Sequence, residues 1–315
     1  MSARRPARWH GLLPVYKKAG PTSHDIVDIA RKTLGERRIG HTGTLDPMAE
    51  GLLVLGVGLA TRLQAHLLGW DKTYRGLIRL GWATTTYDRE GEPMDPRGPA
   101  PELDHAALYE LAAPYVGEVD QVPPPYSAKK VGGKKLYELA RSGEAVEVAP
   151  KKVTVHSLTL DQAGPDLLSL DVRCSSGFYV RSLAHDLGQR LGCGAHLEHL
   201  QRIRIGPYTA SEAMPQDELA SARSEDVVQG NRWTPMEKVQ LPYPEVGLNP
   251  TAAERFTHGQ MVVVFRAGDE PLSTGSLVAA RTLSGQLLGI GTVVNVLARG
   301  RTVSVQPAMV LEAVR

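Results

Sequence analysis

A twelve-residue segment, Gly40 to Gly51, constrains this chain more than any other feature. It reads Gly-His-Thr-Gly-Thr-Leu-Asp-Pro-Met-Ala-Glu-Gly, and its glycines can adopt backbone angles that other residues avoid. Pro47 disfavours helical angles at the preceding residue and so extends the chain at Asp46. A short polar loop of this kind can hold one carboxylate in a defined direction.

The segment that follows the loop, Leu52 to Gly58, is an apolar run with the length of a buried strand. Asp46 therefore lies beside a core element, where a catalytic group is both rigid and accessible. An Asp that precedes Pro is, however, a common turn residue. Taken alone, the loop leaves the structural and the catalytic interpretations open.

The bulk properties of the 315 residues argue against several protein classes. The longest apolar stretch, residues 51–60, is too short to cross a bilayer. The apolar run after the basic N-terminus, residues 11–15, is too short for a signal peptide. Two cysteines, Cys174 and Cys193, are too few for a disulfide framework. We therefore expect a cytoplasmic protein.

The sequence has no motif for a nucleotide or metal cofactor. His196 and His199 lie in a His-Leu-Glu-His segment, which differs from the zinc-binding His-Glu-x-x-His pattern. The segment Gly132 to Lys135 does not match the Gly-x4-Gly-Lys-Ser/Thr phosphate loop. We expect a reaction that uses neither a cofactor nor a metal ion.

Charge is unevenly distributed, although the net charge is only +2. Residues 1–39 contain nine Lys and Arg against three Asp and Glu, and residues 121–152 contain seven against three. Residues 88–120 contain two against nine. This segregation favours basic surfaces that bind phosphates and an acidic face turned away from them, although any single run is also typical of ordinary solvated charge.

The spacing of apolar residues indicates a mixed core of helices and strands. Helical spacing predicts helices, the first with Ser23 as a possible cap, over residues 23–34, 103–115 and 179–191. Alternation predicts strands over residues 73–80, 152–160 and 167–174. We expect a short helix or a turn over residues 196–203.

Further blocks follow the loop in order: Asp-Lys-Thr-Tyr-Arg at 71–75, Tyr-Ser-Ala-Lys at 126–129, Cys-Ser-Ser-Gly-Phe-Tyr-Val-Arg at 174–181, and His-Leu-Glu-His-Leu-Gln-Arg at 196–202. With the loop and Lys17, this ordered set resembles the TruB-type family of pseudouridine synthases, which modify the TΨC arm of tRNA. The resemblance implies an α+β fold, with a mixed, largely antiparallel central sheet and flanking helices.

The resemblance also implies three catalytic residues. Asp46 corresponds to the family's indispensable carboxylate, and Arg181 to the arginine that pairs with it. A guanidinium suits that pairing because it stays charged and can bind both carboxylate oxygens. Tyr74 corresponds to the tyrosine that stacks on the target base. Without the resemblance, each would be interpreted as a turn, surface or packing residue.

Seven further residues are implied to bind the substrate. His41 helps to turn out the target nucleotide, Asp88 organises the same region, and Lys17 braces the loop or the active site. Tyr179 and Leu200 line the uracil pocket. Lys129 and Lys130 belong to a basic, tyrosine-containing segment of the kind that contacts nucleic acid.

The sequence predicts two domains. We expect residues 1–243 to form the catalytic domain, and the resemblance implies that the segment at about 121–150 within it is an insertion that grips the tRNA. A composition shift near Leu241 leads into residues 246–315, where short alternating runs separated by Gly and polar residues are typical of a small β-barrel. This part resembles the PUA-like RNA-binding domain of such synthases.

The predicted function is isomerisation of uridine-55 in the TΨC loop of tRNA, by a monomer that turns the base out and uses an Asp nucleophile. Two alternatives remain. One is the related catalytic subunit of guide-RNA-directed pseudouridylation, which depends on partner proteins. The other is a tRNA-binding or folding chaperone with secondary catalysis.

Overall fold

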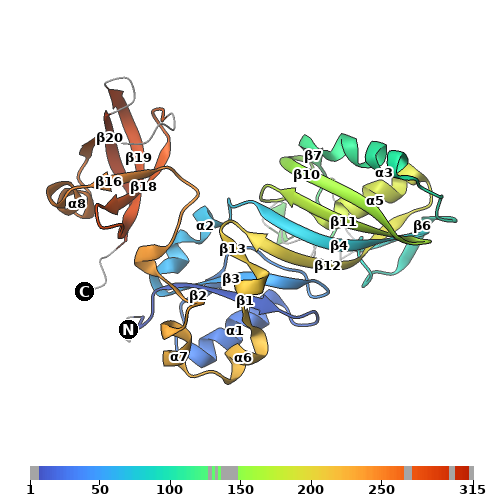
Figure 1. The fold of residues 1–315 in the computed structure, drawn as a ribbon, viewed down its shortest axis with the longest axis horizontal. Coiled ribbons are helices and arrows are strands. Elements are labelled where there is room, and N and C mark those ends of the chain that lie inside the picture. Colours follow the sequence, from blue (N-terminus) through green and yellow to red (C-terminus); the bar gives the residue numbers. More distant parts are fainter. Residues whose placement is uncertain are drawn as a thin grey trace.

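The chain folds around one large mixed sheet, to which a smaller C-terminal sheet is attached (Figure 1). The computed structural model describes residues 7–126, 130–131, 134–135, 148–265, 272–297 and 302–311. In these ranges the large sheet has the strand order β14-β1-β3-β12-β4-β11-β10-β7, with β2, β13 and β15 paired at its margins. Neighbouring strands are antiparallel except for the pairs β1–β14 and β3–β12. The predicted α+β class is confirmed.

The strands of the large sheet are β1 (Gly11–Lys17), β2 (Ile39–His41), β3 (Glu50–Val57), β4 (Lys72–Leu80), β7 (Gly117–Gln121), β10 (Lys151–Gly164), β11 (Leu167–Cys174), β12 (Ala195–Ile205), β13 (Tyr208–Thr209), β14 (Met214–Pro215) and β15 (Thr234–Pro235). Two small hairpins are formed by β5 (Trp82–Thr84) with β6 (Pro93–Arg97), and by β8 (Lys130–Val131) with β9 (Lys134–Lys135).

The helices are α1 (Ser23–Leu34), α2 (Gln64–Leu67), α3 (His105–Ala112), α5 (Val180–Leu191), α6 (Gln216–Ser221), α7 (Ser224–Gln229) and α8 (Pro250–Thr257). Short 3₁₀ helices are η1 (Gly58–Leu63), η2 (Ala113–Tyr115), η3 (Ala210–Glu212) and η4 (Met236–Lys238). The predicted helices over 23–34, 103–115 and 179–191 are confirmed, the second with a 3₁₀ end.

The cap of α1 differs from the prediction and connects this helix to the Asp46 loop. Thr22 is the cap: its hydroxyl accepts from the Asp25 amide (3.1 Å), and the Asp25 carboxylate accepts from the Thr22 amide (2.7 Å). Ser23 instead donates its hydroxyl to the Leu45 carbonyl (2.9 Å) and accepts from the Leu45 amide (2.8 Å). The start of the helix is therefore tied to the residue that precedes Asp46.

The expectation of a short helix or turn over 196–203 is wrong. These residues lie in β12, which pairs with β4 along its length and with β3 at one end. Two bulges, between Leu197 and His199 and between Arg202 and Arg204, interrupt the alternation of side chains. Leu197 and Leu200 are therefore both buried although they are three residues apart, and this spacing imitates a helix.

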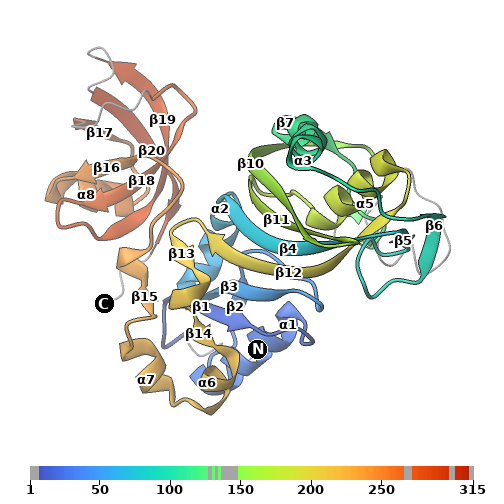
Figure 2. The same cartoon turned by 45° about the vertical axis from the view of Figure 1, so that its right-hand side comes forward.

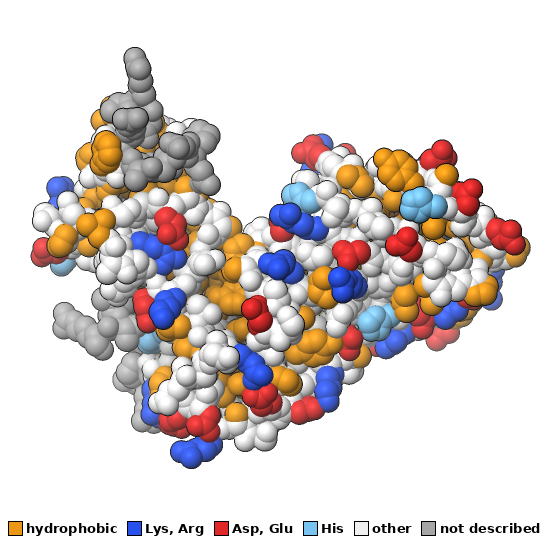
Figure 3. Space-filling model, in the orientation of Figure 1, with side chains coloured by type: hydrophobic (Ala, Val, Ile, Leu, Met, Phe, Trp, Pro, Cys, Tyr) orange, Lys and Arg blue, Asp and Glu red, His pale blue; other side chains and the backbone are white. Residues whose placement is uncertain are grey.

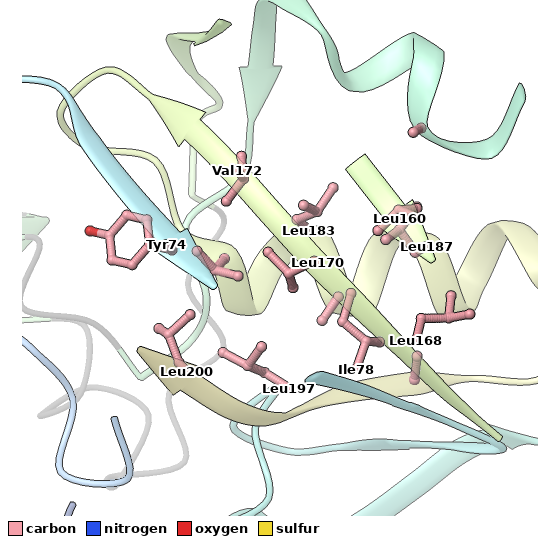
Figure 4. Packing of buried hydrophobic residues seen from close by; sticks show 14 of the residues in the cluster. Tyr74, Ile78, Leu160, Leu168, Leu170, Val172, Leu183, Leu187, Leu197 and Leu200 are labelled. Carbon is pink, nitrogen blue, oxygen red and sulfur yellow. The ribbon is translucent and has the colours of Figure 1, made fainter. Parts of the chain in front are cut away.

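Two separate groups of helices pack on one face of the large sheet, over different strands (Figures 1 and 2). α3 and α5 pack on β4, β10, β11 and β12 through apolar residues that include Leu183 and Leu187 (Figure 4). α1 packs on β1 and β3 through Ile26 and Ala30. On the opposite face, exposed arginines of β4 and β11 pair with acids, as in Arg75–Asp171, and Figure 3 shows basic and acidic side chains intermixed there.

The C-terminal sheet has the order β16-β18-β19-β20-β17. Its strands are β16 (Glu245–Leu248), β17 (Val262–Phe265), β18 (Leu277–Thr282), β19 (Leu287–Leu297) and β20 (Thr302–Val310). The sheet is curled, and α8 closes one end of its core through Phe256 (Figure 2). Leu287 and Ile290 share a hydrophobic cluster with Leu12 and Leu52 of the large sheet. The short alternating runs expected within residues 246–315 form strands β17 to β20, whereas no helix was expected at α8. No helix in the described ranges is long and apolar enough to span a membrane.

Candidate active site

Asp46 lies in the loop between β2 and β3, and the backbone of this loop is held at both sides of the residue. The Ala49 amide donates to the Asp46 carbonyl (3.1 Å), and the Gly20 amide donates to the Pro47 carbonyl (2.9 Å). The Asp46 side chain is 31% exposed. The loop therefore fixes a carboxylate that solvent and a substrate can still reach.

Arg181, in the first turn of α5, binds both carboxylate oxygens of Asp46. Its Nε lies 3.0 Å from Oδ2, and its Nη2 donates to Oδ1 at 3.1 Å. Arg181 itself is only 6% exposed. Two parallel contacts of this kind form the strong, directional type of ion pair. The pairing implied by the resemblance is thus present in the structure.

Asp88 occupies another side of the same guanidinium. Arg181 Nη1 lies 3.3 Å from Asp88 Oδ2 and donates to the Thr86 carbonyl at 3.2 Å. The other oxygen of Asp88 accepts from the Thr86 hydroxyl (2.6 Å) and from the Glu90 amide (3.1 Å). One buried cation therefore lies between two carboxylates, and Asp88 positions it.

Two opposing effects act on the pKa of Asp46. Burial raises the pKa of this carboxyl group above its ordinary value, and the Arg181 charge opposes the rise. Asp88 raises the pKa further, while Arg202 and Lys17 lower it. Although 31% of the Asp46 side chain is exposed, both carboxylate oxygens contact Arg181, so burial still acts strongly on the carboxyl group. The net direction is upward.

Lys17, at the end of β1, is fully buried and braces the loop. Its ammonium group donates to three carbonyls, those of Ala49 (2.7 Å), Lys18 (3.0 Å) and Pro47 (3.2 Å). Burial lowers the pKa of Lys17 to about 8, against the opposing influence of Asp46. Lys17 therefore ties the end of β1 to the backbone on the C-terminal side of Asp46.

Tyr74 and Leu200 lie close together on neighbouring strands (Figure 4). Tyr74 of β4 pairs with Arg202 of β12, and Gly76 pairs with Leu200. Both Tyr74 and Leu200 are buried in the cluster that also contains Leu45 and Met48 of the Asp46 loop. Burial raises the pKa of the Tyr74 phenol, and the charge of Asp46 acts in the same direction. An aromatic face and an apolar wall thus adjoin the loop.

His41 and Tyr179 are positioned mainly through their backbones. Gln64 donates its side-chain amide to the His41 carbonyl, and the His41 ring accepts a long contact from the Gly43 amide (3.4 Å). Burial lowers the pKa of His41. The Gln121 side chain binds the Tyr179 amide (2.7 Å) and its carbonyl (3.0 Å). Tyr179 directly precedes α5, which carries Arg181.

Two family models match the chain in succession. Residues 31–180 match the N-terminal domain of TruB family pseudouridylate synthases, and residues 181–239 match the tRNA pseudouridylate synthase B C-terminal domain. A tRNA pseudouridine synthase B from Thermobifida fusca is 44% identical over 263 residues, which are 80% of this chain and 86% of the relative.

The chain belongs to the TruB family of pseudouridylate synthases. Two other tRNA pseudouridine synthases B support this assignment. The one from Solibacter usitatus is 40% identical over 90% of this chain and 96% of the relative, and the one from Burkholderia mallei is 40% identical over 89% and 92%.

Solved structures agree with the fold of this TruB-family chain. A crystal structure of a Cbf5–Nop10–Gar1 complex contains a chain with a TM-score of 0.73 and 24% identity, covering 96% of this chain and 84% of that one. An H/ACA ribonucleoprotein bound to a substrate RNA has a TM-score of 0.70 and 24% identity, covering 95% and 84%. At this identity the likeness concerns the fold.

Arg202 is the site residue to which the sequence analysis gave no role. Its Nε donates to the Leu52 carbonyl (2.8 Å), Nη1 to Thr44 (3.1 Å) and Nη2 to Gly43 (3.0 Å). A strand assignment would have signalled it, because Arg202 follows Leu200 by two residues and so points to the same buried face. The expectation of a helix or turn hid this relationship.

Several predicted features lie outside the described part of the chain. Lys129 is not described, the side chain of Lys130 is not described, and most of the 121–150 insertion falls in the same gaps. At the edge of that insertion, the Tyr126 carbonyl accepts from Arg181 Nη2 (3.0 Å). Within the described ranges no group of three or more His, Cys, Asp or Glu side chains could hold a metal ion.

Proposed function

We propose that this TruB-family chain isomerises uridine-55 in the TΨC loop of tRNA to pseudouridine. The observation that carries the proposal is the Asp46 carboxylate held by two nitrogens of Arg181, beside the Tyr74 ring. The relatives named tRNA pseudouridine synthase B support tRNA as the substrate. The domain limits, the site residues and the chemical roles below belong to the proposal.

The reaction breaks the N1–C1′ bond of the target uridine and forms a C5–C1′ bond. A proton leaves C5 and one is added at N1, so no redox change or added group is needed. Asp46 acts as the nucleophile or stabilises the positive charge that develops on the sugar when the glycosidic bond breaks. Arg181 favours the ionised form of Asp46 through its two contacts.

The remaining residues hold the substrate. The target base must leave its stack to reach Asp46, and His41 and Asp88 assist this step. Tyr74 stacks on the base, an interaction worth about 1–3 kcal/mol in single-stranded recognition. Tyr179 and Leu200 enclose the uracil, Lys17 braces the loop, and Lys129 and Lys130 bind tRNA phosphates.

We propose the following organisation. Residues 1–243 form the catalytic domain, with the insertion at about 121–150 gripping the TΨC stem-loop. Residues 246–315 form a PUA-like RNA-binding domain, and the curled C-terminal sheet is compatible with that type. The enzyme acts as a monomer in the cytoplasm, and the reaction needs no cofactor.

The test is tritium release from a tRNA transcript labelled at C5 of uridine, with purified protein alone. We expect release by the wild type and none by Asp46→Asn, with tRNA binding and melting temperature retained. Asp171→Asn, which alters an exposed ion pair with Arg75, is the matched control and should remain active. A transcript with cytidine at position 55 should release no tritium from that site.

Two opposite outcomes would contradict the proposal. Wild-type protein that binds tRNA without releasing tritium would favour the guide-RNA-dependent subunit or the chaperone. Normal turnover by Asp46→Asn would remove Asp46 from the reaction.

A further inference from the structure

Arg202 is a buried cation that contacts no acid in the described part of the chain. It is 1% exposed, and three of its hydrogen bonds go to main-chain carbonyls. A side-chain hydrogen bond from Arg202 also acts on the phenol of Tyr74 and lowers its pKa against the larger, opposite effect of burial. A buried charge without a counter-ion is costly to a fold. A buried charge of this kind is tolerated where nearby polar groups stabilise it. Titratable groups with shifted pKa values also cluster at functional sites.

Of the three carbonyls bound by Arg202, two belong to the loop before Asp46 and one belongs to β3 after it. Gly43 and Thr44 precede Asp46, and Leu52 follows it at the start of β3. The backbones also approach closely here, since a Cβ atom at Gly51 would lie 2.3 Å from the Arg202 carbonyl oxygen. One side chain therefore spans both ends of the loop.

The Arg202 charge also acts on the groups around the loop. It lowers the pKa of the Asp46 carboxyl, which Arg181, Asp88 and Lys17 also face. Burial is the main cause that lowers the pKa values of Lys17, His41 and Lys72, and the Arg202 charge adds to it. For Tyr74, burial raises the pKa and the Arg202 charge opposes the rise. Lys72 lies in the same buried region, and its ammonium donates to the Trp70 (2.7 Å) and Leu68 (2.8 Å) carbonyls.

We propose that Arg202 is a positioning residue for the isomerisation: it ties the Asp46 loop to β3 through three carbonyls and adds a second buried positive charge to the surroundings of the catalytic carboxylate. This inference rests on the proposed function. Arg202 acts indirectly, by holding the loop and by lowering the pKa of Asp46 through its charge. Arg181 is the cation in direct contact with Asp46. Small displacements of a catalytic group can cost about a hundredfold in rate.

The test compares Arg202→Met and Arg202→Lys with Arg204→Met. Arg204 lies two residues after Arg202 in β12 and is exposed. Its side chain has no hydrogen bond or ion pair with the described residues, so it is a matched control. Single-turnover tritium release from labelled tRNA is measured from pH 5 to 9 at saturating enzyme, with tRNA affinity and the melting transition alongside.

Arg202→Met should lower the single-turnover rate by about a hundredfold, while tRNA affinity changes by less than about threefold. The acid limb of its pH–rate profile should move to higher pH, because the charge that lowers the pKa of Asp46 is lost. Arg202→Lys keeps the charge but loses the three-pronged geometry. It should recover part of the rate and keep the acid limb of the wild type. Arg204→Met should match the wild type in both respects.

A purely structural role would lower stability without moving the acid limb. The inference is overturned if Arg202→Met or Arg202→Lys melts cooperatively and has the wild-type rate and profile, or if the rate falls only as far as tRNA binding does. Should the Met variant fail to fold, the Lys variant decides alone: a wild-type rate rejects the inference, and a reduced rate with unchanged affinity supports it. Wild-type protein that releases no tritium would reject the proposed function as well.

Discussion

Arg181 binds Asp46 through two nitrogens at once, Nε to Oδ2 at 3.0 Å and Nη2 to Oδ1 at 3.1 Å. The same guanidinium contacts Asp88 and the carbonyls of Thr86 and Tyr126. Segments far apart in the sequence are therefore joined at one planar cation. The arrangement makes the state of Asp46 depend on the placement of α5, of the loop after β5 and of the start of the insertion.

Replacement of Arg181 by Met should reduce both activity and stability. It leaves the buried Asp88 without its cation, which should cost about 3 kcal/mol in the free energy of unfolding. The loss of fixed positive charge at Asp46 should lower the single-turnover rate by about two orders of magnitude. Urea denaturation and tritium release measure the two effects. Arg173→Met, which removes an exposed pair with Asp71, is the control and should cost at most about 1 kcal/mol.

The acid limb of the pH–rate profile should lie above the ordinary pKa of an Asp side chain. Burial raises the pKa of Asp46, and the ionised form is the competent one, so the rate falls as pH is lowered through that raised value. Asp88 adds to the rise, so Asp88→Asn should move the limb to lower pH. Single-turnover rates between pH 4 and 8 report both positions, and a limb that Asp88→Asn leaves in place would contradict the coupling.

Gly51→Ala should destabilise the protein more than Gly20→Ala does. Both residues have left-handed φ angles of nearly equal size, 107° and 110°, so the backbone strain of an alanine is similar. A Cβ atom at Gly51 would lie 2.3 Å from the Arg202 carbonyl oxygen, whereas at Gly20 nothing lies within 4 Å. Overpacking should add about 2 kcal/mol to the cost at Gly51. Equal losses in chemical denaturation would show that the close approach of β3 and β12 is unimportant.

The difference in unfolding free energy between the wild type and Lys17→Met should shift in favour of the wild type as pH rises. Lys17 has a pKa of about 8 in the folded chain, below the value of 10.5 that it has when unfolded. Between these values the unfolded state binds more protons, so this residue's contribution to stability rises with pH. The difference in unfolding free energy should grow by about 2 kcal/mol from pH 7.5 to 9.5. Urea titrations of both proteins at the two pH values measure it, and a constant or shrinking difference would contradict the prediction.

The sequence by itself determined most of the local structure. The apolar run after the loop is the buried strand β3, the alternation at 73–80 is β4, and the periodicity at 23–34 is α1. These elements could be predicted because spacing along the chain reports which faces are buried. The ordered motifs also indicated the family, and with it the pairing of Asp46 and Arg181.

Only the tertiary structure decided how the site is held. β12 could not be recognised from its pattern because two bulges, which depend on pairing with β4, break the alternation at Leu197–His199 and at Arg202–Arg204. Arg202 acquires its role from carbonyls about 150 residues earlier in the chain, and Asp88 meets Arg181 only because α5 packs beside the loop after β5. Such contacts depend on long-range packing, on which the spacing of neighbouring residues carries no information.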